Sequence, residues 1–335
     1  MEGYLVDTGF NQIIKMIEKH KNNAYRKVNE EMILLYLEIG KFLYDLREKS
    51  NYGDKITTKA SVFMKNNYPN IKVFTKRNIE RMIQFYSIYR DDEIASPLVT
   101  QLSWTNNLLI LSGTNSKEER HFYLKLSIKN CYSKRELERQ ISSAYYERYM
   151  LSDGKKLPTV NKTLDENDYP NTKILDTYSL EFLDLPAEFS EKDLKNAIIK
   201  NLKDFILEVG KGFTFIGDEY RIQVGNHDFF IDLLFYNREL SCLVAFELKL
   251  GEFKAEYLGK MNLYLEALDR DVKKEGENPS VGVILCSSKD KDVVEYSISK
   301  NVSQTLISEY KLKLINKKLL ETKLKEMKDL INNND

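Results

Sequence analysis

Two apolar segments in the C-terminal half of the chain carry charged residues where charge is costly. Residues 229–249 read FFIDLLFYNRELSCLVAFELK, two strand-length apolar runs joined by a polar turn. Asp232 interrupts the first run, and Glu247 and Lys249 end the second. An unpaired charge buried in a strand costs several kcal/mol, so such charges are usually paired, bind a metal or line a cleft. Because Glu247 and Lys249 are two residues apart, they project from one face of a strand.

These three side chains predict a site for a hard divalent cation. Mg²⁺ takes oxygen ligands, usually one or two carboxylates with water and phosphate oxygens, and Mn²⁺ is the alternative ion. We expect Asp232 and Glu247 to be the carboxylate ligands and the backbone carbonyl of Leu248 to be a third ligand. Lys249 would orient or help deprotonate the attacking water and stabilise charge in the transition state. Glu208, on an upstream helix, would complete the site through a water molecule.

A structural role is the alternative explanation for each of these residues taken alone. Glu247 and Lys249 would then form a surface charge pair at a strand end, and Asp232 would lie on an edge strand. An aspartate followed by Glu-x-Lys is common by chance, so the spacing is weak support. The occurrence of all three in two apolar strands favours a functional site.

The surrounding sequence predicts an α/β fold with a mixed central sheet flanked by helices. Ser190 is placed to cap a helix that runs to about Val209 and ends at Gly210. Strands and helices then follow in an order typical of an α/β domain. The expected strands are 213–217, 220–224, the two apolar runs, 280–286 and one near Leu306, and the expected helices are 254–269 and 290–300.

The first 150 residues predict a mostly helical domain. Apolar residues recur at helical spacing over residues 8–50 and 57–67, and Ser133 with Glu136 forms a capping box that opens a helix through Tyr149. This half holds 24 Lys and Arg against 18 Asp and Glu, a net charge of +6, whereas the whole chain holds 51 of each. A polar stretch with Gly and Pro follows, and we expect a linker there at 151–180.

Thr75 is a candidate N-cap for a third helix that reaches Tyr89. A short helix, a turn and a helix that opens with basic and amide residues predict a helix-turn-helix, in which Arg reads guanine and Asn reads adenine. The candidate nucleic-acid contacts in its first two turns are Lys76, Arg77, Asn78 and Arg81. A solvated basic face on a packed helix is the alternative, and it stays open.

Several other chemistries lack the residues they need. The chain has three histidines, far apart, and no G-x-S-x-G, C-x-x-C or P-loop pattern. The three cysteines are widely spaced among apolar neighbours, as in a reduced cytoplasmic protein. No run approaches the ~20 apolar residues of a membrane span. We therefore expect a cytoplasmic protein with no membrane partner, and its wealth of Lys, Asn and Ile is compatible with a bacterial source.

Longer segments resemble the YhcG-like family of PD-(D/E)XK nucleases. In the C-terminal half the resemblance is carried by residues 210–269, from GKGFTF to LYLEALD, and by NPSVGVILCSSKD. In the N-terminal half it is carried by LYLEIGKFL, KRNIERMIQFY, TQLSW and SKRELERQI. The resemblance implies a helix-turn-helix or winged-helix-like domain at 1–150, a nuclease domain with a restriction-endonuclease-like fold at 181–312 and a C-terminal helix at 313–335.

The same resemblance implies roles for individual residues. Asp232 and Glu247 are the implied metal ligands, Lys249 is the implied catalytic lysine, and Glu208 matches the acidic position on the first helix of the domain. One position departs from the family pattern, because Lys260 stands where a glutamine usually precedes M-N-x-Y-L.

Basic residues on the helix after the second apolar run are further candidate contacts. Lys254 and Lys260 could hold the backbone of a nucleic acid, or they are ordinary solvated lysines.

We therefore expect a metal-dependent nuclease that hydrolyses phosphodiester bonds, in the first instance a DNA endonuclease acting on double-stranded DNA. Cutting both strands needs two sites, so a homodimer is expected, with the last helix as a candidate contact. Two alternatives stay open. One is a catalytically inactive DNA-binding or complex-assembly protein that kept the nuclease fold, and the other is a nuclease directed at RNA.

Overall fold

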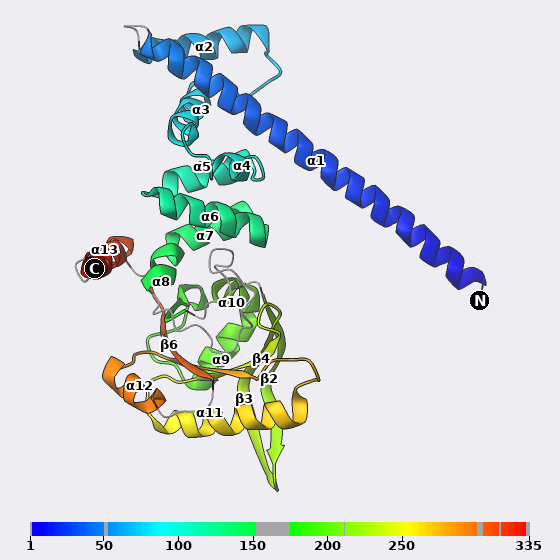
Figure 1. The fold of residues 1–335 in the computed structure, drawn as a ribbon, viewed down its shortest axis with the longest axis vertical. Coiled ribbons are helices and arrows are strands. Elements are labelled where there is room, and N and C mark those ends of the chain that lie inside the picture. Colours follow the sequence, from blue (N-terminus) through cyan, green and yellow to red (C-terminus); the bar gives the residue numbers. More distant parts are fainter. Residues whose placement is uncertain are drawn as a thin grey trace. The chain divides into compact units, whose positions relative to one another are not determined.

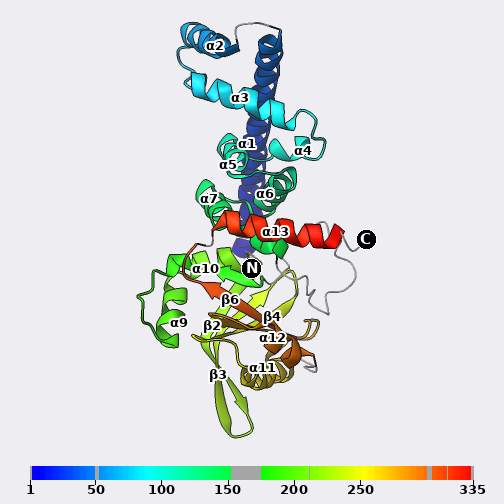
Figure 2. The same cartoon turned by 90° about the vertical axis from the view of Figure 1, so that its left-hand side faces the viewer.

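The protein contains two compact units, Met1–Glu138 and Arg139–Asp335. The computed structural model describes residues 2–49, 53–151, 175–210, 212–299, 304–314 and 316–332. Figures 1 and 2 show that the first unit is built from helices and the second from a sheet with helices around it. The expected division into a helical part and an α/β part is confirmed.

The described part of the first unit is entirely helical. Because it contains no strand, no β wing is seen among these residues. The helices are α1 (Glu2–Glu48), α2 (Gly53–Asn67), α3 (Lys76–Tyr89), α4 (Ser96–Val99), α5 (Trp104–Gly113), α6 (Lys117–Asn130) and the start of α7 (Lys134–Ser142).

Helix α3 is held by a cap and by close packing against α1. The Thr75 hydroxyl accepts a hydrogen bond from the backbone N–H of Asn78 at 3.2 Å, as the sequence predicts. A Cβ atom at Gly40 of α1 would lie 2.3 Å from the carbonyl oxygen of Met82, so only glycine lets the two helices approach this closely. The face of α3 opposite its basic residues is buried and is formed by Ile79, Met82 and Phe85.

The second unit has a six-stranded mixed sheet in the order β1-β6-β5-β4-β3-β2. The β2–β3 and β3–β4 pairs are antiparallel, and the β4–β5, β5–β6 and β1–β6 pairs are parallel. The strands are β1 (Thr177–Ser179), β2 (Phe213–Val224), β3 (His227–Asn237), β4 (Cys242–Leu248), β5 (Val281–Cys286) and β6 (Thr305–Lys311).

Helices cover both faces of this sheet. On one face, Phe205 of α10 packs against Phe235 and Phe246 of the central strands, with ring centroids 5.9 and 5.8 Å apart. On the other face, Met261 and its neighbours on α11 form a core cluster with the strands. The helices are α8 (Tyr145–Leu151), η2 (Glu181–Leu183), α9 (Glu191–Lys200), α10 (Leu202–Val209), α11 (Glu256–Ala267), the π-helical turn η3 (Leu268–Val272), α12 (Lys291–Ile298) and α13 (Lys317–Asn332).

Three expected elements differ in detail from the structure. The expected strands 213–217 and 220–224 are one strand, β2, with a bulge between Phe215 and Gly217 that the apolar pattern does not reveal. The helix expected to run from Ser133 to Tyr149 divides at Ala144, whose φ is 53°. Strand β1 was not predicted, because three residues at a sheet edge carry little pattern.

The contacts that hold the sheet unit together extend to residues before the expected linker. Residues 152–174 of the expected linker lie outside the described residues, but its end forms β1, which pairs with β6. The compact unit that contains the sheet already starts at Arg139. The reason is a buried charge cluster, in which Glu208 of α10 accepts hydrogen bonds from Arg139 of α7 at 2.9 Å and from Arg148 of α8. Gln140 also donates to the backbone carbonyl of Leu207 at 3.0 Å.

Helix α13 packs within its own unit. Its Leu320 and Leu324 are buried, and the Lys317 ammonium lies 3.6 Å from the Glu147 carboxylate of α8. The buried face of α13 is therefore used within its own unit, and the pairing of this helix with a second subunit stays a prediction. None of the described helices combines the length and the apolar character that crossing a membrane requires.

The Glu208 cluster should be the most sensitive polar contact of the fold. Glu208→Gln removes the charge that offsets the buried Arg148 and Arg139 guanidinium groups. We expect the free energy of unfolding to fall by about 3–5 kcal/mol, because an unpaired buried charge remains. The measurement is urea denaturation followed by circular dichroism. Glu266→Gln, which breaks the exposed pair of Glu266 on α11 with Arg270, is the matched control and should change the value by less than about 1 kcal/mol.

Candidate active site

Strand pairing brings the two candidate carboxylates together. The β3–β4 register matches Leu233 with Phe246, so the next residues, Asp232 and Glu247, face each other from neighbouring strands. An Asp232 oxygen accepts a hydrogen bond from the backbone N–H of Leu248 at 2.8 Å. The structure thus assembles the charges that the sequence singled out.

Two ammonium groups share one oxygen of Glu247. The carboxylate is 2% exposed, and its Oε1 atom lies 2.9 Å from Lys249 Nζ and 2.6 Å from Lys260 Nζ. The second oxygen, Oε2, is buried and accepts no hydrogen bond from any described residue. A buried carboxylate oxygen without a donor is costly, so this atom is open to a cationic ligand.

Lys249 is held between two carboxylates. Besides Glu247, it contacts Glu191 at the start of α9, at 3.2 Å, and lies 5.5 Å from the centre of the Tyr257 ring. Burial favours the neutral amine, but the hydrogen bonds to Glu247 and Glu191 outweigh it, and the pKa of Lys249 is raised above its ordinary value. The side chain is therefore a cation at neutral pH.

Asp232 is the group whose ionisation the site opposes. Burial and, after it, repulsion from Glu247 raise the pKa of the Asp232 carboxyl above its ordinary value. The Leu248 N–H and the two nearby lysines act in the opposite direction without cancelling this effect. An added positive charge would relieve the repulsion between the two carboxylates.

Lys260 lies closer to the site than the sequence suggested. We expected it to contact nucleic acid, but its ammonium lies on the carboxylate oxygen of Glu247 and 5.3 Å from the centre of the Tyr264 ring. Burial favours its neutral form, whereas hydrogen bonds to Glu247 and Tyr264 raise its pKa overall. Tyr264 also donates a hydrogen bond to the carbonyl oxygen of Phe230 at 2.7 Å, which ties α11 to β3 two residues before Asp232.

Glu208 does not join this group. Both of its oxygens accept hydrogen bonds from the arginine cluster, and Ser179 N–H donates a further one at 2.7 Å. The expectation that Glu208 completes the site is corrected here, since its carboxylate is already satisfied.

Glu191 is the helix carboxylate beside Lys249, and the sequence analysis missed it. An acidic residue directly after the N-cap Ser190 was the available signal, but such residues also occur wherever a helix begins.

The donor set suits a metal held in part by water and substrate. No group of three or more His, Cys, Asp and Glu side chains that could hold an ion occurs among the described residues. The possible protein ligands are therefore Asp232, Glu247 and the backbone carbonyl of Leu248, all oxygen donors. The partnerless Oε2 of Glu247 fits this role, since carboxylate oxygens are the ligands that a hard cation prefers.

The expected nucleic-acid contacts have different surroundings. Arg77 is exposed, Lys76 lies 3.7 Å from Glu80, and Arg81 donates a hydrogen bond to Gln84. The Asn78 amide is committed to the fold, because it donates to the carbonyl of Val73 at 2.9 Å and accepts from the Trp104 indole at 2.9 Å. The prediction that Asn78 reads a base is therefore corrected.

Lys254, the other lysine expected to hold a nucleic-acid backbone, lies in the loop before α11. Its side chain is exposed.

Comparison with solved structures gives partial likenesses only. A repair endonuclease from Pyrococcus abyssi is 18% identical with a TM-score of 0.27, over 39% of this chain and 50% of that one. The EndoMS–dsDNA2 complex is 17% identical with a TM-score of 0.28, over 38% and 47% of the two chains. The chain thus spans about half the length of these proteins, and scores this low carry no argument about function.

Comparison at the sequence level covers nearly the whole chain. "Putative nuclease YhcG" of Escherichia coli (strain K12) is 29% identical over 93% of this chain and 92% of its own length. A family model for the DUF1016 N-terminal domain matches residues 12–148, and one for the YhcG PDDEXK nuclease domain matches residues 171–325. The chain therefore belongs to the YhcG family of PD-(D/E)XK nucleases, with a DUF1016 domain before the nuclease domain.

Proposed function

We propose that the C-terminal unit is a metal-dependent endonuclease that hydrolyses phosphodiester bonds of DNA. The observation that carries the proposal is the meeting of Asp232, Glu247 and Lys249 at one point of the sheet, with one buried Glu247 oxygen left without a donor. A charge group of this kind inside an apolar core has a high energetic cost, which a purely structural role does not explain.

Mg²⁺ or Mn²⁺ is the proposed cofactor, with Asp232, Glu247 and the Leu248 carbonyl as protein ligands. When bound, the ion supplies a water of lowered pKa and neutralises phosphate charge. Lys249 is protonated at neutral pH, so its role is to orient the attacking water and stabilise negative charge rather than to remove a proton. Glu191 holds the Lys249 ammonium in place from the helix side.

The proposed substrate is double-stranded DNA, held partly through basic side chains. The proposed contacts to phosphates are Lys76, Arg77 and Arg81 of α3 and Lys254 in the loop before α11. Cleavage of both strands by one protein would need two active sites, so a homodimer belongs to the proposal. An inactive binding protein and an RNA-directed nuclease are the rival functions that the experiments below separate.

Removal of either central charge should abolish cleavage while leaving the fold intact. Asp232→Ala removes a proposed ligand, and Lys249→Ala removes the cation, so each should lower the cleavage rate at least about 100-fold. The measurement is the initial rate on plasmid DNA and on RNA of the same length, with Mg²⁺, with Mn²⁺ and with chelator.

Asp228→Ala is the matched control, since it removes an exposed carboxylate of the same strand that pairs with Arg221. It should cleave like wild type. Binding of DNA without cleavage under either metal would favour the inactive protein, and cleavage confined to RNA would favour the RNA-directed enzyme. Normal rates in both Asp232→Ala and Lys249→Ala would refute the assignment of the site.

Lys260→Gln should increase the affinity for the divalent ion. The Lys260 ammonium lies 2.6 Å from Glu247 Oε1 and competes with a cation for that carboxylate. We expect the dissociation constant for Mg²⁺, measured by isothermal titration calorimetry without nucleic acid, to fall about 3–10-fold, on the order of 1 kcal/mol. Lys254→Gln is the control for the lost charge and should leave the constant unchanged. Equal or weaker binding by Lys260→Gln would contradict the competition.

Asp232→Asn should stabilise the metal-free protein at neutral pH. Because folding raises the pKa of Asp232, the stability that this group contributes is present below the pKa of an unfolded aspartate and is lost as the pH rises through its folded pKa. An asparagine cannot ionise, so the variant avoids that loss. We expect a melting temperature about 1–3 °C above wild type at pH 7.5 in chelator, with the difference shrinking toward pH 4. A variant that melts below wild type at pH 7.5 would show that the cost is absent.

A further inference from the structure

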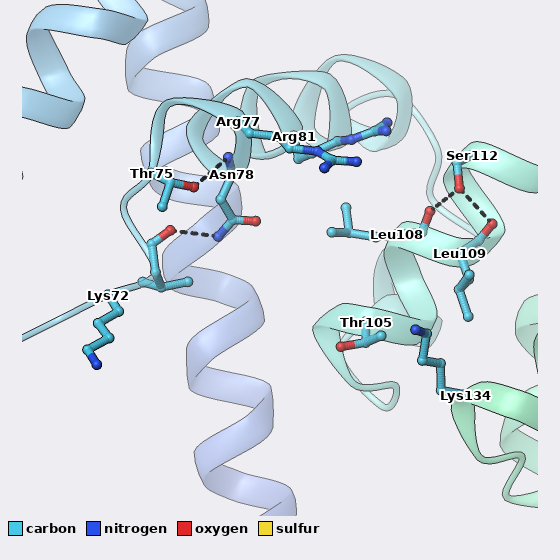
Figure 3. A pocket seen from close by; sticks show the side chains of 11 residues that line it. Lys72, Thr75, Arg77, Asn78, Arg81, Thr105, Leu108, Leu109, Ser112 and Lys134 are labelled. Carbon is cyan, nitrogen blue, oxygen red and sulfur yellow. Dashed lines mark hydrogen bonds between the residues drawn. The ribbon is translucent and has the colours of Figure 1, made fainter.

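A cavity of about 450 Å³ lies in the first unit, beside the first turns of α3 and between this helix, α5 and the start of α7. Figure 3 shows Thr75 and Asn78 at its α3 side, Thr105 and Leu108 on α5, and Lys134 on α7. Its volume falls within the range of small-molecule sites, ~300–1,000 Å³, and is far too small for a duplex.

The charge around this cavity is of one sign. Lys72, Arg77, Arg81 and Lys134 line it, and no carboxylate does. None of the four forms an ion pair with a described residue, although Arg81 donates to the neutral Gln84 amide. Four cations around one small space repel one another, so an anion in that space would be strongly favoured.

The backbone adds to the attraction for an anion. The first N–H groups of a helix have no partner inside the helix, and α3 is 14 residues long, so its dipole also places positive charge here. Thr75 satisfies the N–H of Asn78, and the N–H groups of Lys76 and Arg77 precede it in the first turn. Anions bind at such helix ends in many proteins.

The cavity also has an apolar wall. Leu108 and Leu109 line the α5 side, and Figure 3 shows Leu108 pointing into the space between α5 and α3. The Thr105 hydroxyl lies on the same helix and is exposed. A ligand that matches both parts has a flat apolar group and a phosphate, which is the chemistry of a nucleotide.

We propose that this cavity receives one unpaired nucleotide of the nucleic-acid substrate. Its phosphate would lie against Arg77, Arg81 and Lys134, and its base against Leu108 and Leu109. A paired base cannot enter a space of this size, so the ligand is a single-stranded segment, an overhang or a base displaced from a duplex. The inference rests on the proposed function for its substrate class and adds that DNA is bound more tightly where it offers an unpaired nucleotide, as at an overhang of a duplex.

The experiment measures binding by fluorescence anisotropy with the full chain in chelator, so that cleavage plays no part. The probes are a labelled single strand, a blunt duplex of the same sequence and that duplex with a single-stranded overhang. We expect wild type to bind the single strand and the overhang at least about fivefold more tightly than the blunt duplex, because stacking and apolar contact with one base add to the affinity.

Two variants separate base insertion from charge. Thr105→Trp fills the cavity without changing its charge, and Arg77→Gln with Arg81→Gln removes two cations. Each should weaken single-strand binding at least about tenfold. Only the charge variant should also reduce the slope of the logarithm of the affinity against the logarithm of the salt concentration, by about 1–2. Lys125→Gln, which neutralises an exposed lysine of α6 that does not line the cavity, is the matched control and should change affinity less than twofold.

Three results would overturn the inference. They are equal affinity for blunt and overhanging duplex, unchanged single-strand binding by Thr105→Trp, and displacement of the strand by free nucleotides at similar concentrations, which would identify a free nucleotide as the ligand. A different result would refute the proposed function. A protein that binds strands through the cavity but never cleaves them refutes the nuclease activity and leaves the inference standing.

Discussion

The candidate active site depends on a carboxylate that is buried in the sheet and has its partners on one oxygen only. Glu247 lies in a strand whose residues are all buried, yet one of its oxygens receives two ammonium groups and the other receives no donor among the described residues. The surrounding structure is arranged to sustain this imbalance. The antiparallel β3–β4 pair brings Asp232 beside it, α9 supplies Glu191 to hold Lys249, and α11 supplies Lys260.

The second unit contains two buried carboxylates with opposite surroundings. Glu208 is surrounded by arginines and backbone donors, and although burial opposes ionisation, Arg148 and Arg139 lower its pKa. Its hydrogen bonds hold α7, α8 and strand β1 to α10. Glu247 has cations on one oxygen only. Burial does not separate the two residues, because both are buried. What separates the structural residue from the candidate ligand is whether both carboxylate oxygens have hydrogen-bond donors.

Lys260 places a second ammonium group on the Glu247 carboxylate. Its ammonium lies on Oε1, whereas Oε2 is the oxygen left open to a metal. In the absence of metal, the positive charge of Lys260 offsets the part of the negative charge of the two carboxylates, Asp232 and Glu247, that Lys249 alone does not balance. The same contact sets up a competition between the lysine and a divalent cation, so a residue on the face of α11 influences the affinity of the site.

Much of the fold could be predicted from the sequence, because periodicity and capping are local. The α3 cap at Thr75, the Ser133 capping box and the order of strands and helices in the second unit follow from neighbours along the chain. The three central charges, Asp232, Glu247 and Lys249, stood out because apolar strands make a charge conspicuous. Strand β1 and the division at Ala144 did not, since a short edge strand and one left-handed residue leave no repeated pattern.

Only the tertiary structure could decide which charges meet. Glu208 and Glu191 are both helical glutamates upstream of the strands, and local sequence cannot tell that one faces Arg148 and the other Lys249. Asn78 has the chemistry of a base reader, yet Trp104, distant in sequence, occupies its amide. Side-chain partners depend on how elements pack across the sheet and between helices. The sequence by itself determined which residue types were available, and packing in three dimensions determined which of them remained free to act.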